Sequence, residues 1–445
     1  MVRQMKINGK RLLDNLYALR EFTDTPGKGV TRFSYGEQDV NARRYILDIA
    51  ERLGCSISID ALQNIRLGFK GNVPGRKTIA AGSHIDTVRN GGWLDGIYGV
   101  CGALEVMETL TENLADYDYN YEVVIFAEEE GSGFGSTMTG SKFISGIYDE
   151  SDLDKLKNDE GKTLREVLAP LQTRCCCDVR ENPYRQVQPK EAGVSTQCGE
   201  SSVDISRVMW DFDTVKTMLE LHIEQGPVLD EAGLSIGIVD NIFGMRVIEV
   251  KLDGVGNHAG ATPMSQRHDA LCTAAECILK AEEIVRADED KRTVVTTGKI
   301  EAAPNCSNVI PETVTFTLEV RDRDEAKINK AMDEITGSIR DIADRRRVSC
   351  TIEEHSKSSP LPLNRRLIDS MAARAEGQGL PYKVMDSGAV HDACMIAAHV
   401  DTGMIFVPSI EGRSHVPQEN TAEEHLLTGA QFLMDTVLSE LASGK

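Results

Sequence analysis

Apolar residues recur along this 445-residue chain with two different spacings, and each spacing predicts its own type of element. Helical spacing predicts helices over residues 8–20, 37–53 and 98–114, the second of them ending at Gly54. Short apolar or alternating runs predict strands over residues 56–60, 65–69, 78–81, 122–127 and 218–223. Because strands and helices alternate here, we expect an open α/β sheet with its site at the carboxyl edge of the strands.

The pattern changes after residue 226, where the predicted elements follow the order β-β-α-β-β-α. The strands are expected over residues 235–239, 245–252, 293–300 and 313–320, and the helices over 269–286 and 325–343. This order is typical of a compact, ferredoxin-like α+β domain with a four-stranded sheet and two helices on one face. The α/β pattern then resumes with strands over 348–353 and 403–407 and helices over 365–377 and 422–440.

These patterns predict one domain inserted into another. We expect an α/β domain over residues 1–226 and 346–445, and the α+β domain over residues 227–345. Residues 172–202 are polar, contain proline and are rich in Cys and Ser, so we expect them to form an irregular insertion.

Composition narrows the possible partners. The net charge of −21 argues against nucleic acid or an anionic membrane as the main partner. The net charge is compatible with a small anionic substrate, because a nearby arginine or metal ion outweighs the field of distant carboxylates. The first 16 residues lack the apolar core of a signal peptide, and no later run is long enough to span a bilayer. A cytoplasmic location is therefore expected.

The 11 cysteines are odd in number, and most stand singly in predicted strands or helices, which favours reduced, buried thiols. The exception is the run Cys175–Cys176–Cys177, with Cys198 downstream. A zinc site is one interpretation, although the spacing fits no standard zinc finger. The other is a flexible loop that is prone to oxidation.

Histidines and carboxylates gather at the ends of the predicted strands. Five of them stand at or just after a strand, or in a loop beside one: His84, Asp95, Glu130, His222 and His415. Imidazole and carboxylate ligands suit Zn²⁺ or Mn²⁺, and one carboxylate can bridge two such ions. Asp86 could accept the second N–H of His84 and orient its ring. Glu129 would then be free to act as a base.

Each of these residues also has an ordinary interpretation. A single loop histidine is usually a surface or capping residue, three consecutive glutamates usually begin a solvated helix, and Asp95–Gly96 usually forms a turn. These interpretations fail together, because an apolar strand over residues 123–127 should not end in three carboxylates without a partner for them.

Eight short motifs occur in a fixed order between about residues 12 and 441: GSHIDTV, NGGWLDGIYGV, AEEEGSGFGS, LELHIEQGPVL, GNHAGATPM, NVIP, SGAVHDA and PSIEGRSHVP. With them the chain resembles the N-carbamoyl-L-amino-acid hydrolase and allantoate amidohydrolase group of the M20 amidohydrolases. The resemblance implies a mixed-sheet, dinuclear metallohydrolase domain with an inserted lid and dimerisation domain, and a homodimer formed through that lid.

The resemblance also implies roles for individual residues. His84 and His222 would hold one divalent ion, Zn²⁺ or Mn²⁺, and Glu130 and His415 a second one. Asp95 would bridge the two ions. Glu129 would be the general base that activates a water and then protonates the leaving nitrogen.

Substrate contacts are implied in the same way. His258 and Asn308 match the family's substrate and oxyanion contacts, with His258 expected to reach the site of a partner subunit. Arg321 matches the arginine that binds the substrate carboxylate, although from the residues alone it could equally pair with Asp322 or Asp324. The pocket lining would comprise Gln225, Gly388, Ala389 and His391, of which His391 could also be a buried hydrogen-bonding histidine.

We therefore expect a metal-dependent hydrolase of a linear ureido C–N bond that releases ammonia and carbon dioxide. The stretches around Asn308 and Gly388 resemble allantoate amidohydrolases more than carbamoylases. This resemblance favours an allantoate-type substrate, with N-carbamoyl-L-amino acids second and ureidoglycolate or β-ureidopropionate third. A dipeptidase on the same scaffold is a rival, but peptidases of the wider superfamily usually have an acidic ligand where this chain has His222. A metal-binding protein without catalysis is a further rival, against which the presence of Glu129 argues.

Overall fold

The structure, a computed structural model, describes residues 5–174, 203–288 and 291–444. The predicted insertion, apart from residues 172–174, and the Cys175–Cys177 run lie outside the described residues. The chain divides into two compact units. Unit 1 combines Met1–Asp240, Leu363–Met385 and His391–Lys445, and unit 2 combines Asn241–Pro362 with Asp386–Val390.

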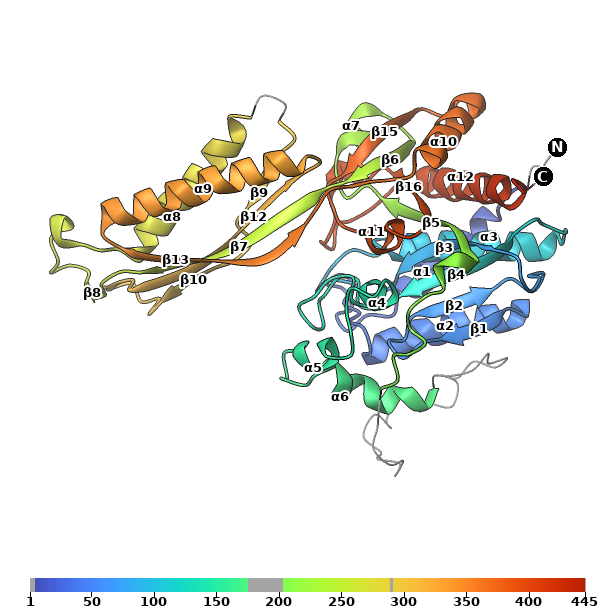
Figure 1. The fold of residues 1–445 in the computed structure, drawn as a ribbon, viewed down its shortest axis with the longest axis horizontal. Helices are drawn as coiled ribbons and strands as arrows, with labels where there is room; N and C mark the ends of the chain where they lie inside the picture. The colour runs from blue at the N-terminus through green and yellow to red at the C-terminus, as the bar shows by residue number, and fades with distance from the viewer. Residues whose placement is uncertain (1–4, 175–202, 289–290, 445) are drawn as a thin grey trace. The chain divides into compact units, whose positions relative to one another are not determined.

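Unit 1 is built on a mixed sheet, as expected (Figure 1). Within the described residues the sheet has nine strands in the order β1-β2-β4-β3-β5-β16-β6-β14, and β15 pairs with β6. They are β1 (Ser56–Ile59), β2 (Ile65–Gly68), β3 (Thr78–His84), β4 (Asn120–Phe126), β5 (Val215–Ile223), β6 (Ile236–Ile242), β14 (Leu361–Pro362), β15 (Tyr382–Ser387) and β16 (Asp401–Val407). The four central strands β4, β3, β5 and β16 are parallel, whereas β1, β2, β6 and β14 join antiparallel.

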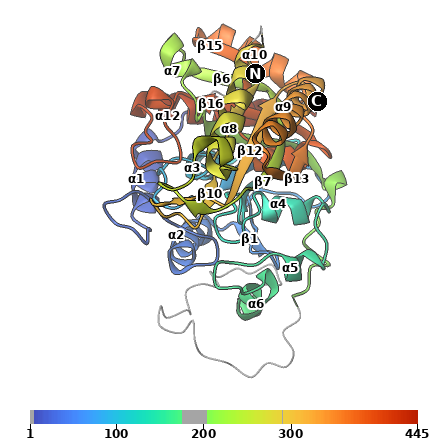
Figure 2. The same cartoon turned by 90° about the vertical axis from the view of Figure 1, so that its left-hand side faces the viewer.

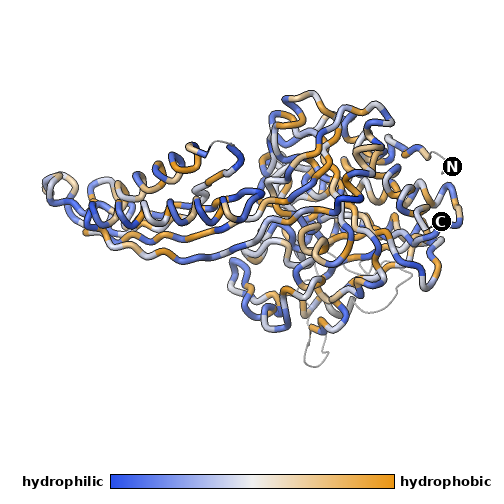
Figure 3. Tube along the Cα trace, turned by 45° about the horizontal axis from the view of Figure 1, so that its top comes forward, coloured by the Kyte–Doolittle hydropathy of each residue, from blue (hydrophilic) through white to orange (hydrophobic). Residues whose placement is uncertain are grey.

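Unit 1 also contains helices. They are α1 (Gly9–Arg20), α2 (Glu37–Leu53), α3 (Ile97–Glu112), α4 (Thr139–Ile144), α5 (Asp152–Lys155), α6 (Leu164–Leu168), α7 (Val228–Ala232), α10 (Arg365–Gln378), α11 (Asp392–Ala397) and α12 (Glu423–Leu441), with 3-10 turns η1 (Ala169–Arg174), η3 (Phe212–Thr214) and η5 (Ile410–Gly412). Helix α3 is apolar on nearly all sides because it contacts β3 on one side and α1 and α12 on others. In Figure 3 the hydrophobic residues of unit 1 gather on its interior strands. No described helix combines the length and the apolar character that crossing a membrane requires.

Unit 2 is a two-layer α+β structure. Its elements are β7 (Gly244–Asp253), β8 (Asn257–His258), η4 (Met264–Gln266), α8 (Ala270–Arg286), β9 (Val294–Thr296), β10 (Ile300–Ala303), β11 (Val309–Ile310), β12 (Thr313–Asp322), α9 (Glu325–Arg346) and β13 (Ser349–Ser358). The sheet order is β10-β12-β7-β13, with β9 also paired to β12. Alternate residues of β12 are buried and face α8 and α9, which lie side by side on one face of the sheet (Figures 1 and 2).

Two strands belong to a different sheet from the one expected. The run at residues 235–239 lies in β6, where Val239 pairs with Met404 of β16 in the large sheet. The run at 348–353 lies in β13, where Ile352 pairs with Val250 of β7 in unit 2. Unit 2 therefore begins at Asn241 and its main segment ends at Pro362, rather than at residues 227 and 345. Alternation along a strand shows which face is buried, but not which strand will be its neighbour.

One further strand prediction is wrong. The single strand expected over residues 293–300 is two short strands, β9 and β10, separated around Gly298. Both pair with β12, so the sheet of unit 2 has five strands among the described residues instead of four.

Candidate active site

Three parallel neighbouring strands bring their carboxyl ends to one edge of the sheet in unit 1. His84 is the last residue of β3, and His222 is the second-last residue of β5. Glu129 and Glu130 follow β4, which pairs with β3 on the side away from β5. Polar side chains that would be costly in the apolar core are thereby placed together at the sheet edge, where open α/β sheets bind ligands.

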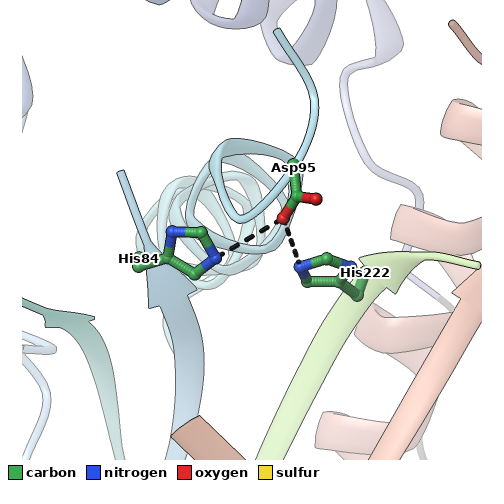
Figure 4. A group of neighbouring side chains, drawn as sticks. All are labelled: His84, Asp95 and His222. Atoms are coloured by element: carbon green, nitrogen blue, oxygen red, sulfur yellow. Dashed lines mark ion pairs between the residues drawn. The ribbon is translucent and has the colours of Figure 1, made fainter. Parts of the chain in front are cut away.

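One oxygen of Asp95 lies between two histidines (Figure 4). Asp95 Oδ1 is 3.5 Å from His84 Nε2 and 3.1 Å from His222 Nε2. All three side chains are buried, with exposed fractions between 1% and 4%. Their ligand atoms lie within 4.8 Å of one another, which is close enough for a single metal ion to contact all three.

The other oxygen of Asp95 faces a second group. His415 Nε2 is 3.4 Å from Asp95 Oδ2 and 3.4 Å from Glu130 Oε2, and these three residues also have ligand atoms within 4.8 Å of one another. Two groups that share one carboxylate, each with nitrogen and oxygen donors, fit a pair of divalent cations. The His415 side chain is 48% exposed, so this second group opens towards the surface.

Backbone hydrogen bonds orient both buried imidazoles. The Nδ1 atom of His84 lies 3.0 Å from the carbonyl oxygen of Asp86, and that of His222 lies 2.9 Å from the carbonyl oxygen of Ile223. A proton on Nδ1 satisfies each carbonyl and leaves Nε2 unprotonated near Asp95, which is the tautomer that a metal ligand requires. In His222 this Nε2 atom also accepts from the backbone N–H of Gly96 at 3.2 Å.

Asp86 differs from the expectation in the atoms that it uses. Its carbonyl oxygen, not its carboxylate, is the close partner of His84, since Oδ1 lies 3.7 Å from that ring. The carboxylate accepts instead from the backbone N–H groups of Glu129 at 3.2 Å and Glu130 at 3.0 Å. Asp86 thus ties the end of β3 to the acidic segment after β4.

The charges in this cluster act strongly on one another. Burial opposes ionisation of Asp95, but His222, His415 and His84 outweigh it and hold the pKa of Asp95 well below its usual range. The hydrogen bond with Asp95 raises the pKa of His415 to about 9. Burial raises the pKa of Glu130 to about 7. Such a set of carboxylates and imidazoles binds protons when it is free of metal and would release them to bind cations.

Glu129 stands beside both groups without belonging to either. Its Oε2 atom is 3.6 Å from His84 Nε2, and the residue is 6% exposed. Burial raises its pKa well above the ordinary value for a glutamate. A carboxylate in this position can take a proton from a water held at the cluster.

Strained backbone supports the site. Gly96 has φ of +68°, and a Cβ atom at that position would overlap the His84 ring. Gln225 and His415 also adopt left-handed conformations, with φ of +63° and +59°. Residues other than glycine are uncommon there, and such strain is concentrated at functional sites.

Two of the pocket residues expected in unit 1 contact the cluster directly. Gln225 Nε2 donates to Asp95 Oδ2 at 2.6 Å. The ring of His391 packs edge-on against His222, with centroids 4.6 Å apart, and is 2% exposed. Both therefore support the ligands, whatever further contact they make with a substrate.

Sequence analysis missed Glu220, which lies next to His222 and His391. Its two oxygens accept from Ser83 Oγ at 2.6 Å and from the backbone N–H of Ala393 at 3.0 Å. Because both oxygens are engaged, we interpret Glu220 as a support for the β3 and β5 edge rather than as a third ion site. Its position two residues before His222 on a strand, and so on the same face, was the available signal.

Unit 2 holds the remaining candidates. His258 pairs with Val309 across β8 and β11, which places His258 beside Asn308, and both residues are exposed. His258 Nδ1 accepts from the N–H groups of Gly260 at 3.0 Å and Ala261 at 3.2 Å. Its proton therefore lies on Nε2, where it can be donated to an oxyanion.

Arg321 lies on β12 and pairs with Glu319, two residues earlier on the same face, rather than with Asp322 or Asp324. Its Nη1 atom donates to the carbonyl oxygen of Gly388 at 3.0 Å. The carbonyl oxygen of Ala389 accepts from Ser387 at 2.8 Å. Arg321, Gly388 and Ala389 thus form one neighbourhood within unit 2.

Comparisons with known proteins agree with this chemistry. Residues 80–439 match the family described as peptidase family M20/M25/M40. The chain is 32% identical to an N-carbamoyl-L-amino-acid amidohydrolase of Paenarthrobacter aurescens, covering 96% of this chain and 97% of that one. It is 33% identical to an allantoate amidohydrolase of Escherichia coli, covering 93% and 94%. A solved amidase of the hydantoinase/carbamoylase family from Burkholderia multivorans superposes with a TM-score of 0.82 at 30% identity, covering 99% and 100%.

Proposed function

We propose that this chain, which belongs to peptidase family M20/M25/M40, hydrolyses a linear ureido C–N bond in a small substrate that carries a carboxylate. The family resemblance expected from the eight motifs is confirmed by the family match. One observation carries the proposal: Asp95 presents one oxygen to His84 and His222 and the other to His415, with Glu129 alongside.

The donor set fits two divalent cations, zinc or manganese. His84, His222 and Asp95 would hold the first, and Asp95, Glu130 and His415 the second. When bound, such cations would polarise a carbonyl group and lower the pKa of a bound water. Glu129, Asp86 and Glu220 add buried carboxylates around this donor set, and their negative charge suits bound cations.

The protein's own side chains would perform the proton transfers and the positioning. Glu129 accepts the proton of the attacking water and then passes it to the leaving nitrogen. His258 donates its Nε2 proton to the developing oxyanion, beside Asn308. Arg321 binds the substrate carboxylate, which makes the attack effectively unimolecular. The products are ammonia and a carbamate that loses carbon dioxide.

The preferred substrate is an allantoate-type ureide. N-carbamoyl-L-amino acids are the second candidate, and the relatives acting on the two classes are almost equally similar, at 33% and 32% identity. Ammonia release should be measured from allantoate, N-carbamoyl-L-amino acids, ureidoglycolate and β-ureidopropionate, with a dipeptide as the control. Turnover that disappears with a chelator and returns with zinc or manganese is expected for one ureide. Turnover of the dipeptide alone would refute the proposal.

We also propose that the enzyme is a homodimer through unit 2, in which His258 serves the site of the partner. The exposed position of His258 and Asn308 supports this role, because both side chains are free to meet a second molecule. The test mixes two inactive variants, Glu129→Gln and His258→Ala. In a mixed dimer one site combines both defects and the other has neither, so random mixing should restore about a quarter of wild-type activity. A mixture that stays inactive, although mixed dimers form, would place His258 in its own subunit's site.

A further inference from the structure

A buried glutamate outside both ligand groups joins the two loops that carry Asp95 and His415. Glu419 is 1% exposed and stands between η5 and α12. Its Oε1 atom accepts from the backbone N–H groups of Leu94 at 2.9 Å and Asp95 at 3.0 Å. Its Oε2 atom accepts from Ser414 Oγ at 2.7 Å and from the N–H of His415 at 3.3 Å.

These hydrogen bonds fix the positions of the two loops relative to each other. Asp95 and His415 lie more than 300 residues apart in the chain, yet one carboxylate fixes the backbone of both. Ser414 adds a second link, because its hydroxyl is also within 3.0 Å of Asp95 Oδ2. The space for Glu419 exists only because residue 92 is glycine: a Cβ atom there would overlap its carboxylate.

The chemistry of these contacts requires a carboxylate. Three of the four partners are backbone N–H groups, which can only donate. The fourth is the Ser414 hydroxyl, whose single proton can go either to Glu419 or to Asp95. A glutamine would fill the same volume, but its NH₂ group would face backbone N–H groups from which it cannot accept: those of Leu94 and Asp95 on one side, or that of His415 on the other.

We propose that Glu419 is a positioning residue that sets the spacing between Asp95 and His415 and thereby the affinity for the outer of the two cations. This inference rests on the proposed dinuclear function. Groups that orient metal ligands typically change metal affinity by about 10–100-fold when they are removed. A purely structural role would instead lower the stability of the fold and leave metal affinity unchanged.

The test uses Glu419→Gln, with Glu440→Gln as a matched control. Glu440 is another buried glutamate of unit 1, 3% exposed, which pairs with Arg366 and Lys216 at the opposite end of β5. Calorimetric titration of the metal-free proteins with zinc and with manganese should show two ions bound by the wild type and by Glu440→Gln. In Glu419→Gln one of the two sites should lose about 10–100-fold in affinity. Thermal unfolding of the metal-free proteins reports stability separately.

Each outcome is decisive. Two ions bound by Glu419→Gln with wild-type affinities would overturn the inference, however much stability is lost. If Glu419→Gln does not fold, Glu419→Asp decides, because it keeps the charge but is too short to reach both loops, and it should show the same loss. A wild type that binds fewer than two ions would refute the dinuclear site, and this role for Glu419 with it.

Discussion

The two units hold their candidate functional side chains in opposite ways. In unit 1, His84, Asp95 and His222 are buried and contact one another. In unit 2, His258 and Asn308 are exposed, and the hydrogen bonds that fix His258 come from its own loop. The first arrangement is preorganised, because its geometry is set by the strands and by the hydrogen bonds around them. The second lies open to solvent, where a substrate or a second molecule can meet it.

This difference in burial predicts a different functional role for each unit. Buried ionisable groups lower the stability of the fold unless they are paired. In unit 1 this cost falls on the candidate metal ligands, whose geometry must stay constant. Exposed polar groups cost little folding free energy, and they can discriminate among ligands. Variants of the unit 1 ligands should therefore affect metal binding and turnover, and variants of Arg321 in unit 2 should affect substrate affinity.

The largest expected effect follows from Glu129→Gln. Removing a general base typically lowers the rate by about 10²–10⁴-fold, so kcat should fall by that factor while metal content stays the same. Glu130→Gln is the matched neighbour, which should lose metal instead because Glu130 lies 3.4 Å from His415 in the outer group. Ammonia release and metal analysis on both variants check this. Full activity in Glu129→Gln would remove Glu129 from the mechanism.

Gly96→Ala should disrupt the preorganised group next. The added methyl group would overlap the His84 ring at a residue with φ of +68°, so the ring must move and metal affinity should fall by about 10–100-fold. Gly54→Ala provides the control: Gly54 has a similar φ of +73°, but a Cβ atom there meets nothing within 4 Å. It should cost only about 1 kcal/mol of stability, measured by chemical unfolding. Equal metal affinities in the two variants would contradict the prediction.

Arg321→Lys tests the role of unit 2 in the comparison. A lysine cannot form the bidentate contact with a carboxylate, so KM for the ureide should rise by roughly 10-fold while kcat and metal content change little. Arg246→Lys is a control on the adjacent strand β7, where Arg246 pairs with Glu354. Steady-state kinetics distinguish the two. A change in kcat alone would mean that Arg321 does not bind the ground-state carboxylate.

The smallest effect concerns the pH dependence of stability in unit 1. Burial raises the pKa of Asp60 to about 7, against about 4 in an unfolded chain. Between these values only the unfolded chain releases the proton, so the folded state loses relative stability as pH rises from about 4 to about 7. The loss should be on the order of 2 kcal/mol, since the side chain is partly exposed. Asp60→Asn should abolish this slope in denaturant unfolding followed across that pH range; an unchanged slope would assign it to another group.

Much of unit 1 was predictable because its signals are local. The continuous apolar runs that became β3, β4 and β5 could be recognised from the sequence, and so could the polar residues at their ends. The neighbours of β6 and β13 could not be predicted, because the choice between two sheets depends on strands far away in the chain. Glu220 and Glu419 were missed for the same reason: Ser83 and Ala393, the partners of Glu220, and Leu94, a partner of Glu419, lie 137 residues away or farther.

The sequence by itself determined which side chains are available, namely imidazoles and carboxylates at the ends of apolar runs, together with the motifs that indicate the family. Only the tertiary structure decided how they are used: Asp95 turns one oxygen to each ligand group, Asp86 accepts from His84 through its carbonyl, and Gln225 contacts Asp95. The physical reason is the distance along the chain over which each effect acts. Periodicity and turn chemistry act over a few residues, whereas the direction of a buried polar atom is set by whichever partners the whole fold brings within hydrogen-bonding distance.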